Sequence, residues 1–260
     1  MTKKEIYREY GIEFNGDKIN SPIGYVSPLL VDGNSKIGKG VYHFSTLPAN
    51  VDFEVTVQGK RMTVKGTCPC HCKGCYAMSG NFKRYQSTRD SLAMRTVIAR
   101  EHLDFFERAV NAQIRADKVK IIRIHASGDF FSLAYALAWR RIAENNPAVL
   151  FWTYTKNKDC ESVFDGLSNA NIVKSVIAGK GFNFGHCDYI LACYEYLKEQ
   201  GKSVYICRCG IDKEQHCVNC HGCAKNEYVL FLEHSTEYKA EKDPLFPVLK
   251  AVIEAQPKQD

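Results

Sequence analysis

Apolar residues occupy every second position from 53 to 57 and from 62 to 64, on either side of the polar run Gln58-Gly59-Lys60. A period of two interrupted by a turn predicts a β-hairpin. The first fifty residues have only short apolar stretches among many Gly, Pro, Ser and Asn residues. They predict an irregular cap that packs on a main domain.

From Ser87 to about Asp117 the apolar residues recur at spacings near three and four, which predicts a long helix with room for a break. Beyond it, β-branched runs alternate with amphipathic segments. The strands are expected at 119–125, 149–154, 172–177, 204–207 and 228–233, and the helices at 133–144, 160–167, 187–200 and 244–254.

Six strand-then-helix units result when 62–66 is counted as the first strand, and such units favour parallel pairing with right-handed crossovers. We therefore expect an α/β fold, a partial (βα)6 TIM-like barrel, rather than a flat doubly wound sheet. The expected domains are a cap and hairpin (1–60), a βα core (61–206), and a cysteine-rich loop with the last strand and helix (207–260).

The composition is that of a globular protein, with 45% apolar and 25% charged residues among 260. Twelve cysteines are too few for a disulfide-stapled scaffold, and no run is apolar enough for a signal sequence or a membrane span. The reducing cytoplasm is the expected compartment, where clustered cysteines usually bind metal. The net charge of +6 permits a nucleic-acid partner without requiring one.

The first cysteine cluster, CPCHCKGC, lies just after the hairpin. Cys68, Cys72 and Cys75 have the spacing C-x3-C-x2-C, which suits three irons of a [4Fe–4S] cubane and leaves the fourth iron open to a chelating amine and carboxylate. The main alternative is a zinc site with His71, Cys72, Cys75 and either Cys68 or Cys70 as ligands. A disulfide is a further alternative.

The second cluster has the ferredoxin-like spacing C-x2-C-x2-C at Cys217, Cys220 and Cys223. Cys207, at the end of a predicted strand, is the favoured fourth ligand, and Cys209 is the alternative. Four thiolates leave no open iron, so this site predicts a closed [4Fe–4S] cluster that stores or relays an electron, or else a structural zinc ion.

Polar residues at the carboxyl ends of the predicted strands are further candidates, because ligands collect at that edge of α/β sheets. Asp129 is a candidate ligand or catalytic group, against a role as a helix N-cap ahead of Leu133. Lys156 is a candidate catalytic group, against a solvated lysine. His125, with a core histidine as its alternative, belongs to the same set. The further members are Ser127, Thr153, Tyr154, Thr155, Gly179, Lys180, Gly181 and Asn183.

Cys68, Cys72 and Cys75 resemble the cluster motif of the radical S-adenosylmethionine (SAM) superfamily. Ser127-Gly128-Asp129-Phe130 is similar to the Gly-rich acidic motif with which that superfamily contacts the amine of SAM, although the superfamily pattern is Gly-Gly-Glu-Pro. The resemblance implies a partial barrel, SAM as a cofactor, Gly128 and Asp129 near its amine, and a reductant such as ferredoxin or flavodoxin.

The strings CPCHCKGCYA, IHASGDFFS, WTYTK and CVNCHGCAKNEYVLFLEH together resemble the phage- and plasmid-borne "gene product 88" domain family. This resemblance implies an iron–sulfur protein of a mobile element, in the host cytoplasm if phage-encoded. The expected function is radical generation from SAM on an unknown small or macromolecular substrate. The alternative is a non-catalytic electron carrier, or a zinc-stabilised module that binds nucleic acid.

Overall fold

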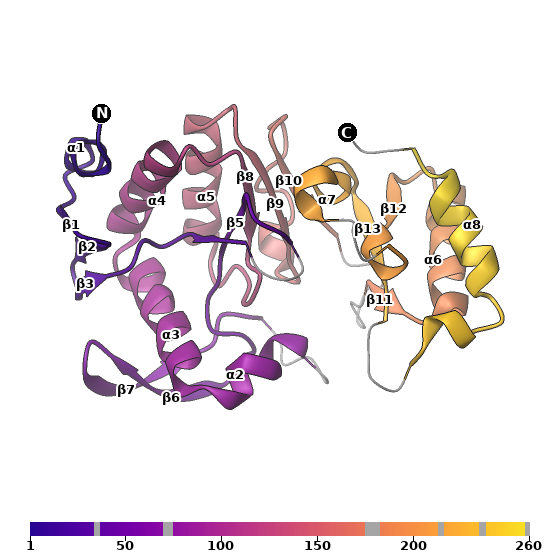
Figure 1. Ribbon diagram of the computed structural model, residues 1–260, viewed down its shortest axis with the longest axis horizontal. Coiled ribbons are helices and arrows are strands. Elements are labelled where there is room, and N and C mark those ends of the chain that lie inside the picture. Colours follow the sequence, from indigo (N-terminus) through magenta and orange to yellow (C-terminus); the bar gives the residue numbers. More distant parts are fainter. Residues whose placement is uncertain (34–36, 70–74, 175–182, 213–215, 234–237, 258–260) are drawn as a thin grey trace.

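A mainly parallel sheet organises the larger part of the protein (Figure 1). The computed structural model describes residues 1–33, 37–69, 75–174, 183–212, 216–233 and 238–257. The sheet has the strand order β10 (Ala170–Val173), β9 (Leu150–Tyr154), β8 (Ile121–Ile124), β5 (Val41–Phe44) and β4 (Val31–Asp32). All neighbours pair in parallel except the edge strand β4, which is antiparallel to β5.

The two faces of this sheet have different coverings, because successive side chains of a strand point to opposite faces. One face packs on α4 (Leu103–Asp117) and α5 (Leu133–Asn145). There Phe44 meets Phe106 and Trp139 edge-on, with ring centroids 5.2 and 5.7 Å away. The opposite face has no such helix layer among the described residues; instead the cysteine-rich segment 217–224 packs on Val41, Ile121 and Trp152.

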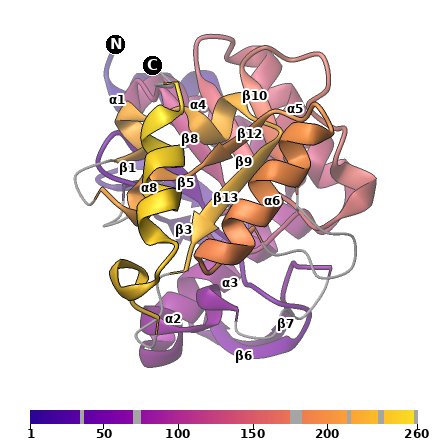
Figure 2. The same ribbon diagram turned by 90° about the vertical axis from the view of Figure 1, so that its right-hand side faces the viewer.

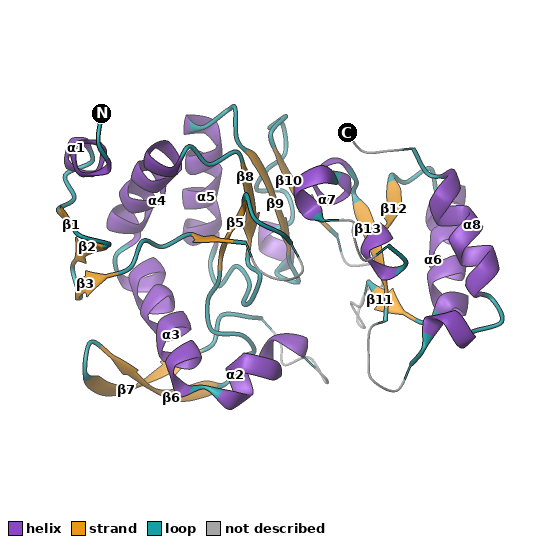
Figure 3. Ribbon diagram, in the orientation of Figure 1, coloured by secondary structure: helices purple, strands orange, loops and turns teal. Residues whose placement is uncertain are grey.

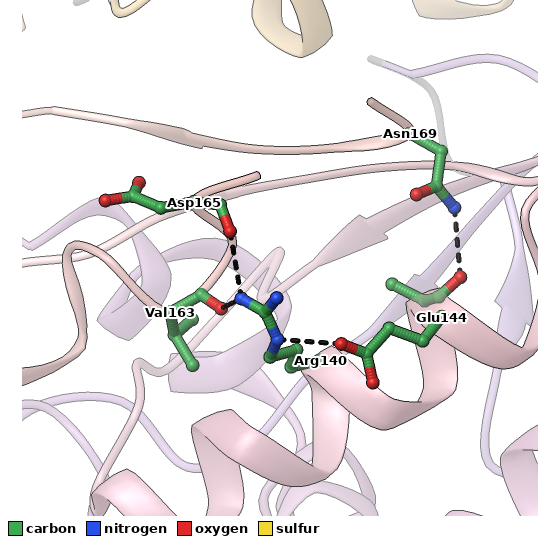
Figure 4. A network of polar contacts seen from close by, with 6 residues as sticks. Arg140, Glu144, Val163, Asp165 and Asn169 are labelled. Atoms are coloured by element: carbon green, nitrogen blue, oxygen red, sulfur yellow. Dashed lines mark hydrogen bonds and ion pairs between the residues drawn. The ribbon is translucent and has the colours of Figure 1, made fainter. Parts of the chain in front are cut away.

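Arg140 of α5 ties that helix to the connection between β9 and β10 (Figure 4). Its guanidinium donates to the carbonyls of Val163 and Asp165, at 2.8 and 3.0 Å, and to Glu144. Here the sequence predicts a helix at 160–167, and that prediction is wrong. The segment holds only the 3-10 turn η2 (Lys158–Cys160) and further turns, in which backbone N–H groups donate to carbonyls three residues earlier, as Val163 does to Cys160.

The amino-terminal region is more regular than the predicted irregular cap. It contains α1 and a small antiparallel sheet of three strands. The elements are α1 (Lys3–Glu9), β1 (Phe14–Asn15), β2 (Lys18–Ser21) and β3 (Gly24–Val26). Thr2 and Glu5 form a reciprocal capping box at the start of α1, which explains why so short a helix is specified.

The predicted hairpin is confirmed: β6 (Asp52–Val57) and β7 (Lys60–Lys65) pair antiparallel as a separate two-stranded sheet. The long helix is also confirmed together with its break, since α3 (Gln86–Glu101) and α4 meet at His102. Val55, Val64 and Leu92 form a small core between the hairpin and α3. The short elements η1 (Tyr76–Met78) and α2 (Gly80–Arg84) precede α3.

A second parallel sheet carries the C-terminal part, in the order β11 (Phe184–Gly185), β13 (Tyr228–Leu232), β12 (Val204–Ile206). Two helices, α6 (Cys187–Glu199) and α8 (Phe246–Ala255), pack together on it (Figure 2). One bridge, Lys174 with Tyr228, links it to the larger sheet. Short turns fill the segment between β12 and β13 (Figure 3), namely η3 (Arg208–Gly210), η4 (Cys217–Asn219) and α7 (Gly222–Lys225); η5 (Ala240–Lys242) precedes α8.

The predicted partial (βα)6 TIM-like barrel is therefore wrong, and the fold is a mixed α/β structure with several small sheets. The segment 62–66, taken as the first barrel strand, lies in the hairpin and does not join the parallel sheet. Its place is taken by β5, which was assigned to the cap. The described strands divide into four sheets, and none of these sheets closes on itself.

Candidate strand-end site and metal centre

The carboxyl ends of β5 and β8 bring the Ser127–Asp129 loop beside the start of the first cysteine cluster. Thr46, just after β5, donates its backbone N–H to the carbonyl of Ser127, and the Ser127 hydroxyl donates to the carbonyl of Thr46, both at 3.0 Å. Thr67, the residue before Cys68, accepts the backbone N–H of Asp129 at 3.0 Å. The first cysteine and the Ser-Gly-Asp loop are therefore neighbours, and Thr46 and Thr67 connect them.

Gly128 lies where no side chain fits. Its φ is +87°, and an added Cβ would lie 1.9 Å from the hydroxyl of Thr46 and 2.6 Å from that of Thr67. These two hydroxyls are 2.9 Å apart and hydrogen-bonded to each other. Glycine therefore lets the loop approach the residues that lead into Cys68.

Asp129 is buried, with 5% of its surface exposed, and its carboxylate has three protein donors. One oxygen accepts from the Thr155 hydroxyl at 2.6 Å and the Phe130 N–H at 2.7 Å; the other accepts from the Lys156 N–H at 2.8 Å. Burial raises the pKa of Asp129 to about 6, and these hydrogen bonds oppose that rise. The N-cap of α5 is Ser132, so the N-cap explanation of Asp129 is wrong.

Lys156 contributes its backbone to this network, and its ammonium is near enough to lower the pKa of Asp129. His125, by contrast, is a core residue. Its Nε2 is 2.9 Å from the hydroxyl of Tyr135 and its Nδ1 is 3.4 Å from that of Thr153. Burial, with help from Arg123, lowers its pKa to about 3, so the ring is neutral near pH 7.

The first cysteine cluster is described at two of its three predicted ligands. The thiol of Cys68 accepts the backbone N–H of Ala49 at 3.2 Å, and Cys75 lies just before η1, where its carbonyl accepts from Met78. Both side chains are partly buried. Cys72 lies outside the described residues, as do Cys70 and His71.

The second cluster brings five thiols together, which we call the C-terminal cysteine group: Cys207, Cys209, Cys217, Cys220 and Cys223. Cys209 is hydrogen-bonded through its sulfur to both Cys207 and Cys217. Cys220 and Cys209 are also close enough to raise the pKa of Cys223. The alternative ligand Cys209 thus sits at the centre of the group, and the favoured Cys207 is its neighbour.

Two tyrosines of the surrounding strands reach this group. Tyr154, at the end of β9, donates its hydroxyl to the Cys223 thiol at 2.8 Å, and the hydroxyl of Tyr205 in β12 is 3.5 Å from Cys220. The Arg123 guanidinium lies over the Tyr154 ring, 5.3 Å from its centroid. Tyr154 therefore belongs to the cysteine group and not to the Asp129 site with which the sequence reading placed it.

Burial and thiol–thiol contacts raise the pKa values of three thiols of the group. The hydrogen bond from Cys209, followed by burial, raises the pKa of Cys207 and that of Cys217 well above the ordinary value, and burial raises the pKa of Cys223 to about 12. Without a cation these thiols stay protonated. Bound metal would replace their protons, so the donor set fits a metal or an iron–sulfur cluster.

The backbone also fixes this group in place. The side chain of Asn171 in β10 donates to the carbonyls of Cys223 and Asn226, both at 2.8 Å, and Cys207 donates its N–H to Leu230 at 2.8 Å. None of the ten described cysteines forms a disulfide bond. Among the described residues, no three His, Cys, Asp or Glu side chains already surround one point as the ligands of a single ion do.

Sequence reasoning missed several residues of both sites. Thr46 and Thr67 hold the Asp129 loop, and no motif marks them, whereas Thr155 was among the predicted strand-end residues. Arg123 carried a usable signal, because it is a charge inside the apolar strand Ile-Ile-Arg-Ile. A charge in a buried strand needs a partner, and here the partner face is the cysteine group.

The fold and the two cysteine motifs define a mixed α/β protein with a cysteine-rich junction between its sheets. Its sequence matches the family described as "Gene product 88" over residues 28–182, more than half of the 260-residue chain, and the chain belongs to that family. No solved structure matches, so no barrel neighbour supports the predicted fold. Every helix in the described ranges is too short or too polar to cross a membrane.

Two phage proteins illustrate the similarity. The chain is 54% identical to the Gene 88 protein of Mycobacterium phage L5 over 37 residues, which are 14% of this chain and 16% of the relative. It is 33% identical to the Gene 88 protein of Mycobacterium phage D29 over 85 residues, which are 28% of this chain and 35% of the relative. The chain thus matches about a third or less of the length of these curated relatives.

Proposed function

We propose that this protein is an iron–sulfur protein with two [4Fe–4S] clusters. The single observation that carries the proposal is the C-terminal cysteine group, in which five half-buried thiols lie close together against a sheet. Cys217, Cys220 and Cys223 are the assigned ligands, and Cys207 or Cys209 supplies the fourth. Such a closed cluster stores or relays an electron.

The first cluster is assigned to Cys68, Cys72 and Cys75, with one iron left open. The N–H of Ala49 that points at the Cys68 thiol supports this assignment, because backbone donors stabilise thiolate ligands. The reducing host cytoplasm, where both sets of thiols stay free, is the proposed compartment.

Radical generation from SAM is the proposed activity at that open iron. It is supported by Thr67, which joins Cys68 to the Gly128–Asp129 loop. When bound, an open-site cluster supplies the electron for reductive cleavage of the SAM sulfonium. Asp129 does not fit as a ligand of the SAM amine in the described conformation, because its carboxylate is buried and held by three protein donors. We therefore give it a positioning role.

Metal analysis tests the cluster assignment. We expect anaerobically purified or reconstituted protein to be brown and to hold about eight irons and eight sulfides per chain. Colourless protein with about two zinc ions would overturn the assignment and favour the alternative, a zinc-stabilised binding module. In that case, salt-dependent binding to DNA or RNA would identify a nucleic-acid partner.

Product analysis tests the SAM step separately. Protein with a full complement of iron is reduced with dithionite, or with ferredoxin or flavodoxin, and incubated with SAM. We expect 5′-deoxyadenosine and a change in the electron paramagnetic resonance (EPR) signal of the first cluster. Full iron with neither effect would leave an electron-transfer protein as the function.

A further inference from the structure

The sheet face beneath the C-terminal cysteine group carries two polar side chains that point at its thiols. Tyr154 and Arg123 lie on adjacent parallel strands, β9 and β8, on the face opposite to the α4 and α5 helices. The apolar residues Ile121 and Trp152 are buried on that face, which also carries His43 beside Arg123 and Asn171 beside Trp152. A phenol and a guanidinium in this position need a reason, since apolar residues would pack there at lower cost.

Their geometry supplies the reason. The Tyr154 hydroxyl donates to the Cys223 thiol at 2.8 Å, which is short for a hydrogen bond to sulfur. The Arg123 guanidinium lies over the Tyr154 ring, 5.3 Å from its centroid, and is close enough to interact electrostatically with Cys217 and Cys223. One hydrogen-bond donor and one cation therefore face the sulfurs that the proposed cluster would use.

We propose that Tyr154 and Arg123 set the reduction potential of the second cluster by stabilising its reduced state. The inference rests on the proposed function, since it assumes that Cys217 and Cys223 are cluster ligands. One-electron reduction adds negative charge that spreads onto the thiolate sulfurs. A donor hydrogen bond and a nearby positive charge stabilise the more negative state more strongly, so both raise the potential.

A purely structural role for Tyr154 makes a different prediction. The ring packs edge-on against Phe231, with centroids 5.8 Å apart, and lies under the Arg123 guanidinium. The variant Tyr154→Phe keeps the ring and these contacts and removes only the hydroxyl. If packing were the whole role, the variant would retain the parent potential.

The experiment is an EPR-monitored redox titration of the iron-loaded parent, Tyr154→Phe, Arg123→Gln and Arg123→Lys. We expect Tyr154→Phe to hold the parent amount of iron and to shift the second cluster to a more negative potential. A tenfold change in the redox equilibrium constant, which is about 59 mV for a one-electron couple, is the expected order. Arg123→Gln should shift in the same direction, and Arg123→Lys should recover most of the loss.

Tyr205→Phe is the matched control, because its hydroxyl is 3.5 Å from Cys220 and should contribute less. Parent protein without iron overturns the proposed function. Iron-loaded Tyr154→Phe with an unchanged potential overturns this inference alone. If Tyr154→Phe fails to fold, resonance Raman spectra of the parent in H₂O and D₂O decide instead: an isotope-insensitive Fe–S(Cys) band contradicts the hydrogen bond.

Discussion

The Asp129 site and the C-terminal cysteine group are both buried clusters of polar atoms, but they satisfy those atoms in opposite ways. Around Asp129, hydroxyls and backbone N–H groups match the acceptors closely, and the carboxylate has three donors. In the cysteine group, thiols face thiols, and mutual contact with burial raises the pKa values of Cys207 and Cys217. The first arrangement is complete as a protein structure, whereas the second is a set of thiols whose protons a bound cation would replace.

This difference separates a positioning element from a binding site. A complete network holds the ends of β8 and β9 together and needs no ligand, so removing one partner should cost stability at any metal load. An incomplete network of thiols should gain stability and form only when metal is present. Asp129 was chosen from the sequence because it follows a strand. That position alone does not distinguish a residue that positions a loop from one that binds a ligand.

The largest expected effect comes from the cysteine group. Replacing Cys223 with Ser should remove one ligand and lower the iron content from about eight to about four atoms per chain. Cys160→Ser is the control, because Cys160 is buried in the main core, outside both cysteine clusters. Iron and sulfide assays measure both variants. Equal iron in Cys223→Ser and the parent would contradict the assignment.

The strand-end loop should respond to sterics regardless of metal. Gly128→Ala should lower the free energy of unfolding by roughly 3 kcal/mol or more, because the new methyl meets the Thr46 and Thr67 hydroxyls. Gly166→Ala has a similar φ of +84° but open space around it, so roughly 1–2 kcal/mol is expected from backbone strain alone. Urea denaturation measures the difference, and equal losses would contradict a crowded loop.

Asp129 should show a pH dependence of defined sign. Its pKa in the folded protein is about 6, above the ordinary 3.8, so folding favours its protonated form. Its contribution to stability is complete below about pH 4 and is lost as the pH rises through 6, by roughly 3 kcal/mol in total. The stability of the parent relative to Asp129→Asn should therefore fall by that amount between pH 4 and 7.

The measured quantity must be the difference in stability between the parent and Asp129→Asn. The stability of the parent alone also depends on histidines, whose effect has the opposite sign. Burial lowers the pKa of His125 to about 3 and that of His43 to about 4, so both make the fold more stable as the pH rises through this window. Denaturant titrations at four pH values isolate Asp129. A constant difference would show that its carboxyl has an ordinary pKa.

The smallest effect is expected at Lys156. Its bond to Asp129 comes from the backbone N–H, which any residue except proline provides. Lys156→Met should therefore change the free energy of unfolding at neutral pH by no more than about 0.5 kcal/mol. A loss above about 2 kcal/mol would show that the ammonium itself holds the network. A large fall in SAM cleavage with unchanged stability would support the predicted catalytic role.

Much of the local structure was predictable from periodicity. The hairpin, the broken helix before β8, and the strands β8, β9, β12 and β13 follow their apolar patterns. The proximity of Cys68 to the Gly128 loop was expected for the wrong reason, because the strand before Cys68 lies in the hairpin, and Thr46 and Thr67 make the connection instead. Three closely spaced cysteines in the C-terminal segment predicted a common site.

The assembly of these elements was not predictable in the same way. Val41–Phe44 is a four-residue strand after glycines, so its local signal was too short to place it in the sheet. The hairpin strand 60–65 has the same alternation of apolar and polar residues as a strand of the larger sheet. Its backbone hydrogen bonds are made with the neighbouring strand of the hairpin, so it does not need the larger sheet. The sequence does not show which element covers each face of β9. The prediction therefore placed Tyr154 in one site with Asp129, although the two side chains face different sites.

The cysteine-rich segment is also the packing material between the two parallel sheets, which share one backbone bridge at Lys174 and Tyr228. If its thiols bind iron, the metal also holds the two sheets together at this junction. Oxygen damage or iron starvation would then loosen the chain at the junction first, where a protease would cut it. The lifetime of the protein in an infected cell would in this way follow the iron supply of that cell.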